Sequence, residues 1–393
     1  MKSPPTSLRH VFLCCSIFVT PIFAQDSEKS EATPARVTTW IQQMDKNSDG
    51  KLAEAETSGL MKQFFGRNDT NKDGFLDVAE LTAVSRILAT RDRRGQQNQR
   101  SVMNTKKLLA DAPADVKVIP DIAYRKGESE AWKLDLIMPK AESEEPRPGI
   151  IFVHGGGWRG GDKRAGTFLN GAIEYAQKGY VCITVNYRLV DEAPLPACIE
   201  DVKCAVRWFR ANAEKYNVNP QKIGAFGNSA GAHLVCMLGL TGKGTGLEGD
   251  GPYQDQSSLV QAVCASATPT DFNLFRNVRQ ASGRSSLFGD ADGEARDKLI
   301  AKTSPITHVS SDAPPILLFH GTKDNTVDVK HSDSFVAALK DAGAKDVTYL
   351  RIEGAGHGVF NQHKDECGPA MEAFFARVLK EGEAKKDEEK PQG

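Results

Sequence analysis

The sequence has almost no net charge, because 50 lysine and arginine residues are balanced by 51 aspartate and glutamate residues, a formal charge of −1. A chain without a basic excess carries no electrostatic footprint for nucleic acid or for an anionic membrane surface. It also contains no C-x-x-C pair and no zinc-ligand spacing. We therefore expect neither a nucleic-acid partner nor a cysteine-based metal centre.

Long apolar runs are missing after the first 24 residues. Near the N-terminus, Lys2 and Arg9 precede a short apolar stretch at 11–20, and Ala24 supplies a small residue at a cleavage position. This order is typical of a secretory signal peptide, here 1–24, and the run is too short to span a bilayer comfortably. We expect a secreted or periplasmic protein with no stable membrane insertion after cleavage.

Six cysteines remain after that cleavage, and an exported protein can pair them. Three of the six lie in apparent core strands or in a core helix, which favours buried free thiols, and no bridge can be assigned. The six are Cys182, Cys198, Cys204, Cys236, Cys264 and Cys367.

Two acidic twelve-residue loops lie in a small helical segment at 36–90, and both fit the pattern D-x-N-x-D-G-x5-E. Calcium takes six to eight oxygen ligands, and the glycine at position six allows the sharp turn. Positions one, three, five and twelve offer side-chain oxygens, and position seven offers a backbone carbonyl. Position nine adds Asp77 in the second loop, whereas Ala53 at that position of the first loop would leave a water to complete the site. The expected ligands are Asp45, Asn47, Asp49, Lys51 and Glu56 in the first loop, and Asp69, Asn71, Asp73, Phe75, Asp77 and Glu80 in the second.

This segment resembles a pair of EF-hands, although only residues 57–68 separate its loops. That separation leaves room for one shared helix, so a compact, dockerin-like arrangement is expected. Leu52 and Leu76 occupy position eight of their loops, which predicts a short strand pairing between them. The resemblance implies bound calcium with a structural role, and no part for calcium in the chemistry.

The segment 91–115 is polar and is expected to be a linker, and the charged tail at 381–393 is expected to be disordered. Between them, at 116–380, apolar runs and helical patterns alternate. This alternation predicts an α/β domain with a mainly parallel sheet covered by helices on both faces. The expected strands are 132–138, 149–153, 181–186, 222–226, 260–265, 315–319 and 347–352, and the clearest helices are 197–216 and 331–344.

The central motif of this domain is Gly227-Asn228-Ser229-Ala230-Gly231. A strand-like run ends just before it and a helical run follows it, which is the arrangement of a nucleophile elbow. The glycines leave space around a serine held at strained backbone angles. Ser229 is therefore the expected nucleophile.

A second motif, His154-Gly155-Gly156-Gly157-Trp158, directly follows the strand at 149–153. It lacks the lysine and serine or threonine that end a P-loop. Glycine-rich backbone at this position suits an oxyanion hole, in which N–H groups stabilise the negative charge of the transition state. The expected donors are Gly156, Gly157 and Ala230.

The two remaining catalytic groups should follow later strands, in the chain order serine, acid, histidine. His357 lies in a glycine-rich loop after the strand at 347–352, and Asp324 lies after the strand at 315–319. We expect Asp324 to hold the N–H of His357, with Asp328 as the alternative acid. His320 is expected to pack at the strand end as a structural residue.

Residues 120–380 resemble α/β-hydrolase esterases of the hormone-sensitive-lipase-like and bacterial feruloyl- and acetylxylan-esterase-like group. The resemblance rests on the two motifs above, on Asn186-Tyr187-Arg188-Leu189, on His320-Gly321-Thr322-Lys323-Asp324 and on Gly356-His357-Gly358. It implies hydrolysis of acetyl or feruloyl esters of carbohydrates or of other small esters, without a cofactor for the chemistry. It also implies a lid at 271–303, where Phe272, Phe275 and Phe288 either line an acyl pocket or pack a surface helix.

Two alternatives remain at this stage. A prolyl-oligopeptidase-like serine peptidase shares the fold and the triad, although the HGGG turn argues against it. A calcium-dependent binding module with an inactive hydrolase fold is also possible, although the intact triad argues against it.

Overall fold

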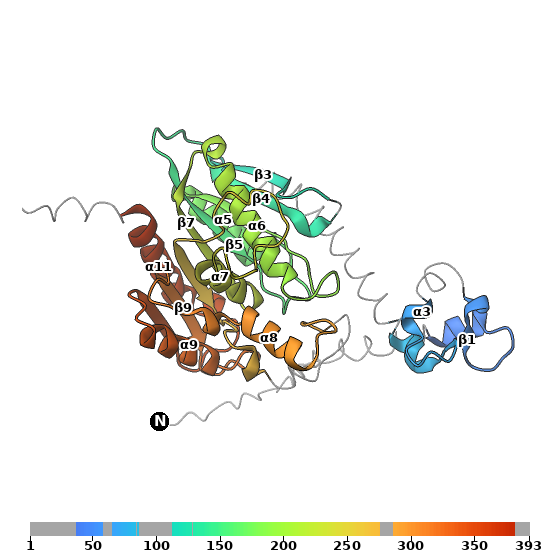
Figure 1. Cartoon of the computed structure of the whole chain (residues 1–393). Coiled ribbons are helices and arrows are strands. Elements are labelled where there is room, and N and C mark those ends of the chain that lie inside the picture. The colour runs from blue at the N-terminus through green and yellow to red at the C-terminus, as the bar shows by residue number, and fades with distance from the viewer. Residues whose placement is uncertain are drawn as a thin grey trace, which may run out of the picture. The chain divides into compact units, whose positions relative to one another are not determined.

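The structure is a computed structural model that describes residues 37–57, 65–83, 85, 112–127, 129–275 and 286–381. The chain divides into two compact units, Met1–Asn104 and Thr105–Gly393, both drawn in Figure 1. The signal peptide expected at 1–24, most of the linker expected at 91–115 and nearly all of the tail expected at 381–393 lie outside the described residues.

The small unit contains two short strands, β1 (Leu52–Ala53) and β2 (Phe75–Leu76), which pair antiparallel. Leu52 lies opposite Leu76, so the pairing predicted from position eight of the two loops is confirmed. Helical residues 37–44 and 78–83, the 3-10 turn η1 (Glu54–Glu56) and α3 (Phe65–Asn68) surround this pair. The small hydrophobic core consists of Val37, Leu52, Phe65, Leu76 and Leu81.

The large unit contains an eight-stranded sheet with the strand order β10-β9-β8-β7-β5-β6-β4-β3. The six strands from β10 to β6 run parallel, while β4 and β3 are antiparallel to their neighbours. The predicted α/β fold with a mainly parallel sheet is therefore confirmed. The strands are β3 (Val116–Ala123), β4 (Lys133–Pro139), β5 (Arg147–Val153), β6 (Val181–Val185), β7 (Val218–Asn228), β8 (Ala262–Ser266), β9 (Ile316–Gly321) and β10 (Val347–Ile352).

Helices cover both faces of this sheet and create two separate cores. Helices α5 (Gly166–Gln177) and α11 (Lys364–Phe375) contribute to one core. Helices α6 (Ala197–Ala211), α7 (Ala230–Leu240), α8 (Gly293–Thr303) and α9 (Lys330–Asp341) contribute to the other. The shorter elements are η2 (Glu130–Trp132), η3 (Glu214–Tyr216), η4 (Phe272–Leu274), η5 (Pro305–His308), α10 (Val359–Gln362) and the π-helical turn Ala376–Lys380.

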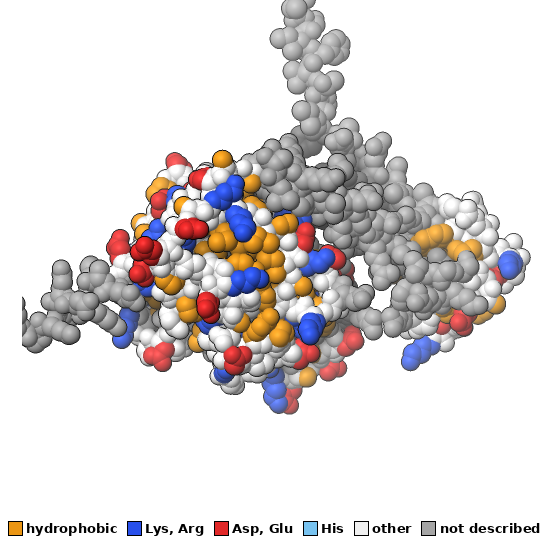
Figure 2. All heavy atoms as spheres, turned by 90° about the horizontal axis from the view of Figure 1, so that it is seen from above, with side chains coloured by type: hydrophobic (Ala, Val, Ile, Leu, Met, Phe, Trp, Pro, Cys, Tyr) orange, Lys and Arg blue, Asp and Glu red, His pale blue; other side chains and the backbone are white. Residues whose placement is uncertain are grey.

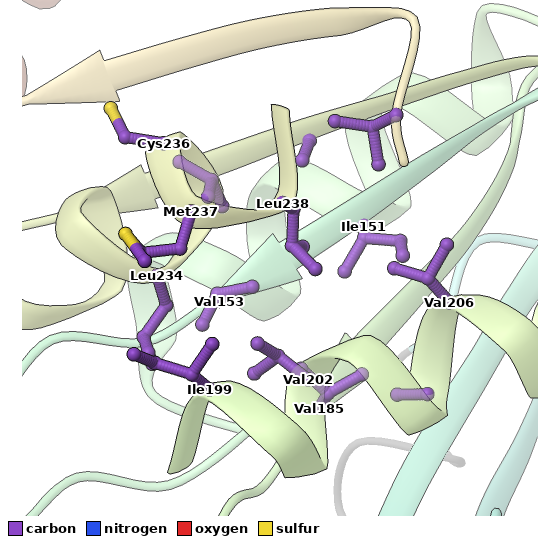
Figure 3. Close-up of a cluster of buried hydrophobic side chains, with 14 of the residues drawn as sticks. Ile151, Val153, Val185, Ile199, Val202, Val206, Leu234, Cys236, Met237 and Leu238 are labelled. Atoms are coloured by element: carbon purple, nitrogen blue, oxygen red, sulfur yellow. The ribbon is translucent and has the colours of Figure 1, made fainter. Parts of the chain in front are cut away.

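The core beside β5 is shown in Figure 3, where aliphatic side chains of the sheet meet those of two helices. Ile151 and Val153 of β5 lie against Val202 of α6 and Leu234 and Leu238 of α7, and all are fully buried. Burying one such side chain contributes about 1.5–3 kcal/mol to folding. This packing fixes the start of α7 against the ends of the central strands, where the site described below lies.

The six cysteines beyond the N-terminal segment are all free and buried. The predicted buried thiols at Cys182, Cys236 and Cys264 are therefore confirmed. No helix within the described ranges is long and apolar enough to cross a bilayer. Figure 2 shows one face of the large unit, on which hydrophobic side chains form a patch bordered by charged ones.

Candidate active site

The predicted elbow is present at the junction of β7 and α7. Ser229 lies between these elements with φ 55° and ψ −122°, a combination that is costly for any residue with a side chain. A Cβ atom on Gly227 would lie 2.3 Å from the carbonyl oxygen of Gly231, and one on Gly231 would lie 2.1 Å from that of Val153. Neither glycine can therefore carry a side chain while the elbow keeps this shape.

The structure brings together the three side chains that the sequence placed after different strands. Nε2 of His357 lies 3.0 Å from Oγ of Ser229, and Nδ1 of His357 lies 2.8 Å from Oδ2 of Asp324. Because Nδ1 faces a carboxylate, it carries the ring proton, and Nε2 accepts from the serine hydroxyl. Asp328, the alternative acid, instead accepts a hydrogen bond from the N–H of Lys330.

The convergence follows from the order of the strands. Ser229 follows β7, Asp324 follows β9 and His357 follows β10, and these strands run parallel in one sheet. The carboxyl ends of parallel strands meet at one edge, which is where open α/β sheets bind ligands.

Asp324 is surrounded by hydrogen-bond donors. Burial by itself would raise the pKa of its carboxyl group, but His320, His357 and the N–H groups of Val327 and Thr326 together hold that pKa well below its usual value. At neutral pH the carboxylate is therefore ionised, and it can serve as the negative partner of His357.

The glycine-rich loop after β5 passes directly over the elbow. A Cβ atom on Gly155 would lie 2.7 Å from the carbonyl oxygen of Asn228 and 3.3 Å from Cβ of Ser229. His154, at the start of this loop, is buried, stacks on Tyr187 with ring centroids 4.4 Å apart and accepts the Tyr187 hydroxyl on its carbonyl oxygen at 2.8 Å. The loop is therefore anchored on its strand side.

Among the described residues, the N–H groups of the predicted oxyanion donors donate to no backbone carbonyl. Gly156 and Gly157 have φ values of 118° and 60°, and within the described chain their N–H groups donate no backbone hydrogen bond. Ala230 is the first residue of α7, so its N–H has no partner inside the helix. These three N–H groups, next to Ser229 in the chain or in the loop above it, can donate hydrogen bonds to an oxygen that develops negative charge.

A second contact between this loop and α7 was not predicted from the sequence. Nε1 of Trp158 donates to Nδ1 of His233 at 3.3 Å, and Nε2 of His233 donates to the carbonyl of Thr303 at 2.8 Å. His233 lies four residues after Ser229, one helical turn further along α7. That spacing was the only sequence signal for this contact, and it gave no indication of the partners.

The phenylalanines of the expected lid are largely packed in the core. Phe272 and Phe288 are buried, and Phe272 contacts the rings of Trp158, His233 and Phe288. The side chains of Phe272 and Phe288 therefore pack in the core rather than line an acyl pocket. Residues 276–285 of the expected lid lie outside the described part of the chain.

Two buried histidines near the site make stability depend on pH. Burial lowers the pKa of His233 to about 4, and burial together with the neighbouring His320 lowers that of His331 to about 4. In an unfolded chain a histidine titrates near pH ~6.5. Between these values the unfolded state binds more protons, so the free energy of unfolding should fall as the pH falls, by about 1.4 kcal/mol per pH unit for each histidine.

Denaturant titrations at several pH values across this window should show that slope, and His331→Gln should reduce it by up to about 1.4 kcal/mol per pH unit. A free energy of unfolding that stays flat through the window would contradict the assignment of both groups as neutral and buried.

The two acidic loops of the small unit share one geometry. Gly50 and Gly74, at position six, have φ values of 79° and 84°, and each donates its N–H to the aspartate at position one. Oδ1 of Asp45 is buried without a hydrogen-bond partner in the described residues. An unsatisfied carboxylate oxygen at position one fits the chemistry of a hard cation.

The remaining expected ligands are held by hydrogen bonds within the loops. Asn47, Asp49, Asn71 and Asp73 accept backbone N–H groups two residues further on. Glu56 and Glu80 accept N–H groups near the starts of their loops, and Asp77 accepts the N–H of Glu80. Lys51 immediately precedes β1, and Phe75 is the first residue of β2. Among the described residues, no three carboxylate, imidazole or thiol groups are gathered closely enough to hold a metal.

The mainly parallel sheet, the elbow and the serine–histidine–aspartate contacts define an α/β-hydrolase. The chain belongs to the BD-FAE family, whose model matches residues 134–339, more than half of the chain. An EF-hand family model matches residues 61–85, which include the second acidic loop. The predicted resemblance to both families is confirmed.

Curated relatives and solved structures point the same way. The chain is 29% identical over 250 residues to Esterase LipC and 31% identical over 250 residues to Esterase LipQ, both of Mycobacterium tuberculosis. These matches cover 63% and 60% of this chain and 62% and 56% of the relatives, so the chain spans about three fifths of their length.

Among solved structures, a truncated carbohydrate esterase from gut microbiota is 29% identical, with a TM-score of 0.60 over 67% of this chain and 96% of that one. Esterase 2 of Thermogutta terrifontis, phosphorylated by paraoxon, is 26% identical, with a TM-score of 0.54 over 67% of this chain and 95% of that one.

Proposed function

We propose that this protein hydrolyses carboxylic esters through an acyl-enzyme formed on Ser229. The observation that carries the proposal is the pair of contacts made by His357, 3.0 Å to the serine oxygen and 2.8 Å to the Asp324 carboxylate. Nucleophile, base and orienting acid within hydrogen-bond reach are the groups that acyl transfer needs. The relatives named as esterases support the same reaction.

In the proposed mechanism, Oγ of Ser229 attacks the ester carbonyl while Nε2 of His357 takes its proton. The carbonyl oxygen becomes an oxyanion and accepts hydrogen bonds from the N–H groups of Gly156, Gly157 and Ala230, one of which lowers the barrier by about 3–4 kcal/mol. His357 then protonates the leaving alcohol. Asp324 stays ionised and stabilises the imidazolium.

The second half of the reaction reverses these roles. A water molecule takes the place of the alcohol and gives a proton to Nε2 of His357 as its oxygen attacks the acyl carbonyl. The second oxyanion uses the same three N–H groups. When it collapses, His357 returns the proton to Oγ of Ser229 and the carboxylic acid leaves.

The proposed substrates are acetyl or feruloyl esters of carbohydrates. The support is the similarity to a carbohydrate esterase over nearly the whole length of that structure, and the expected signal peptide, which would export the enzyme to polymeric substrates. A secreted or periplasmic location is part of the same proposal.

A substrate panel tests the proposal directly. Purified full-length protein is assayed on nitrophenyl acetate, acetylated xylan, a feruloyl sugar, short-chain lipid esters and a peptide anilide. We expect hydrolysis of the nitrophenyl ester and the highest kcat/KM on one of the two carbohydrate esters. Cleavage of the anilide alone would overturn the esterase proposal, and a preference for lipid esters would overturn the substrate class.

We also propose that the two loops of the small unit bind calcium in a structural role. The residues that would hold it are Asp45, Asn47, Asp49, Glu56 and the carbonyl of Lys51 in the first loop, and Asp69, Asn71, Asp73, Asp77, Glu80 and the carbonyl of Phe75 in the second. Calcium supplies charge neutralisation to these acidic loops when bound, and no step of ester hydrolysis depends on it.

Removing calcium should lower the melting temperature of the small unit and leave ester hydrolysis unchanged. A ligand present at 100 times its Kd stabilises the folded state by about 2.7 kcal/mol. The measurement is thermal unfolding of the full chain in calcium and in a chelator, with Glu80→Gln reducing the difference. Glu54→Gln is the control, because Glu54 is an exposed residue of the first loop at a position that supplies no ligand. Identical unfolding curves in calcium and chelator would refute the proposal.

A further inference from the structure

His320, near the end of β9, is fully buried, and both of its ring nitrogens have partners. Its Nε2 lies 2.9 Å from the carbonyl oxygen of Val327 and 3.3 Å from Oδ2 of Asp324. Its Nδ1 lies 2.6 Å from Oγ of Ser332, a buried residue of α9. Both groups that face Nε2 are acceptors, so Nε2 carries the proton, and the Ser332 hydroxyl donates to Nδ1.

These contacts hold Asp324 from two directions. Oδ2 of Asp324 is the oxygen that faces His357, and it is also the oxygen beside the His320 N–H. Oδ1 accepts the N–H groups of Thr326 and Val327 at 2.8 and 2.9 Å. Val327 therefore donates to Asp324 with its N–H while its carbonyl accepts from His320. The imidazole of His320 therefore contacts both the carbonyl of Val327 and Oδ2 of Asp324, the carboxylate oxygen that also contacts His357.

A packing role alone does not account for this arrangement. An apolar side chain of similar volume would fill the same buried space without the cost of burying a polar ring. The ring is instead oriented by a hydroxyl from α9, with its N–H directed at the turn that carries Asp324. Functional side chains need support of this kind, because their productive geometry tolerates deviations of only about 0.5 Å.

We propose that His320 is a positioning residue, which fixes the Asp324 carboxylate and through it the imidazole of His357. The inference rests on the proposed esterase function and assigns His320 no contact with substrate. Its loss should therefore lower kcat and leave KM unchanged, because substrate binding does not involve this side chain.

The first test compares two replacements on nitrophenyl acetate. His320→Leu should lower kcat about 10- to 100-fold at constant KM, the size expected from a small misplacement of a catalytic group. His320→Gln, whose amide can supply the same N–H, should recover most of that loss. His308→Leu is the matched control, because His308 also contacts a carbonyl oxygen, that of Lys302 at 2.8 Å, but has no catalytic neighbour in the proposed mechanism. Its kcat should equal that of the wild type.

The second test is a double-mutant cycle with Asp324→Asn, followed by the rate at which an activated fluorophosphonate labels Ser229. If His320 acts through Asp324, His320→Leu should cost less than about twofold in the Asp324→Asn background. Ser332→Ala, which leaves His320 in place but removes the donor to its Nδ1, should give a smaller loss of the same kind, and it replaces His320→Leu if that variant does not fold.

The outcomes separate the inference from the function on which it rests. A wild-type protein without esterase activity would overturn the proposed function. An active wild type with full kcat in His320→Leu, or with the same fold-loss in both backgrounds, would overturn the positioning role and leave the function intact.

Discussion

Replacing Ser229 with alanine should lower kcat for ester hydrolysis by about a million-fold, the loss seen when a triad serine is removed from an enzyme of this mechanism. The reason is that Oγ of Ser229, 3.0 Å from Nε2 of His357, is the atom that forms the acyl bond in the proposed mechanism. Residual hydrolysis should come only from the oxyanion donors and from binding, and it should no longer show a burst of the first product. The measurement is pre-steady-state release of nitrophenol.

Substitution of Ser229 should also change the free energy of unfolding, because the backbone of this residue is strained. Ser229 has φ 55° and ψ −122°, which costs a residue with a side chain about 1–3 kcal/mol and costs glycine little. Ser229→Gly should therefore be inactive but about 1 kcal/mol more stable than Ser229→Ala, measured by denaturant unfolding. Ser311→Ala, at an exposed position far along the chain from the elbow, is the control and should change neither property. Burst kinetics that survive in Ser229→Ala would remove the nucleophile from the proposed mechanism.

The convergence of the site could be predicted because each of its members follows a strand. The motifs around Ser229, Asp324 and His357 all lie at carboxyl ends, and parallel strands bring those ends to one edge. The chain order of serine, acid and histidine then narrowed the many aspartates and histidines to Asp324 and His357 as candidates. The seven expected strands are all present, with shifts of a few residues at their ends.

What the sequence could not predict depends on contacts between distant elements. Strand β3 was missed because it lies at the edge of the sheet and several of its residues are only partly buried, so it lacks a continuous apolar run. The partners of His233 and His320 were missed for a related reason. The sequence around a buried histidine does not show whether the side chain only packs, hydrogen-bonds a carbonyl or orients a carboxylate. Only the tertiary structure distinguishes these roles.

Replacing Gly155 with alanine should lower kcat by about 100-fold, although the change adds a single methyl group. That methyl would lie 2.7 Å from the carbonyl oxygen of Asn228 and 3.3 Å from Cβ of Ser229, and the nearest atom belongs to backbone that cannot rotate away. The oxyanion loop and the elbow must therefore separate by several tenths of an ångström or more. A displacement approaching 1 Å between nucleophile and oxyanion donors costs about that much in rate.

Gly160→Ala is the matched control, because it adds the same methyl group to the same loop at a point where no heavy atom lies within 4 Å. Its kcat and melting temperature should equal those of the wild type. In Gly155→Ala the loss should fall on kcat, with KM changed only a few-fold, because the oxyanion contact is made most strongly in the transition state. Equal kcat values for the two variants would show that the rate of hydrolysis does not depend on the close contact between the Gly155 loop and the elbow. Donors other than the amides of Gly156 and Gly157 would then have to be proposed for the oxyanion.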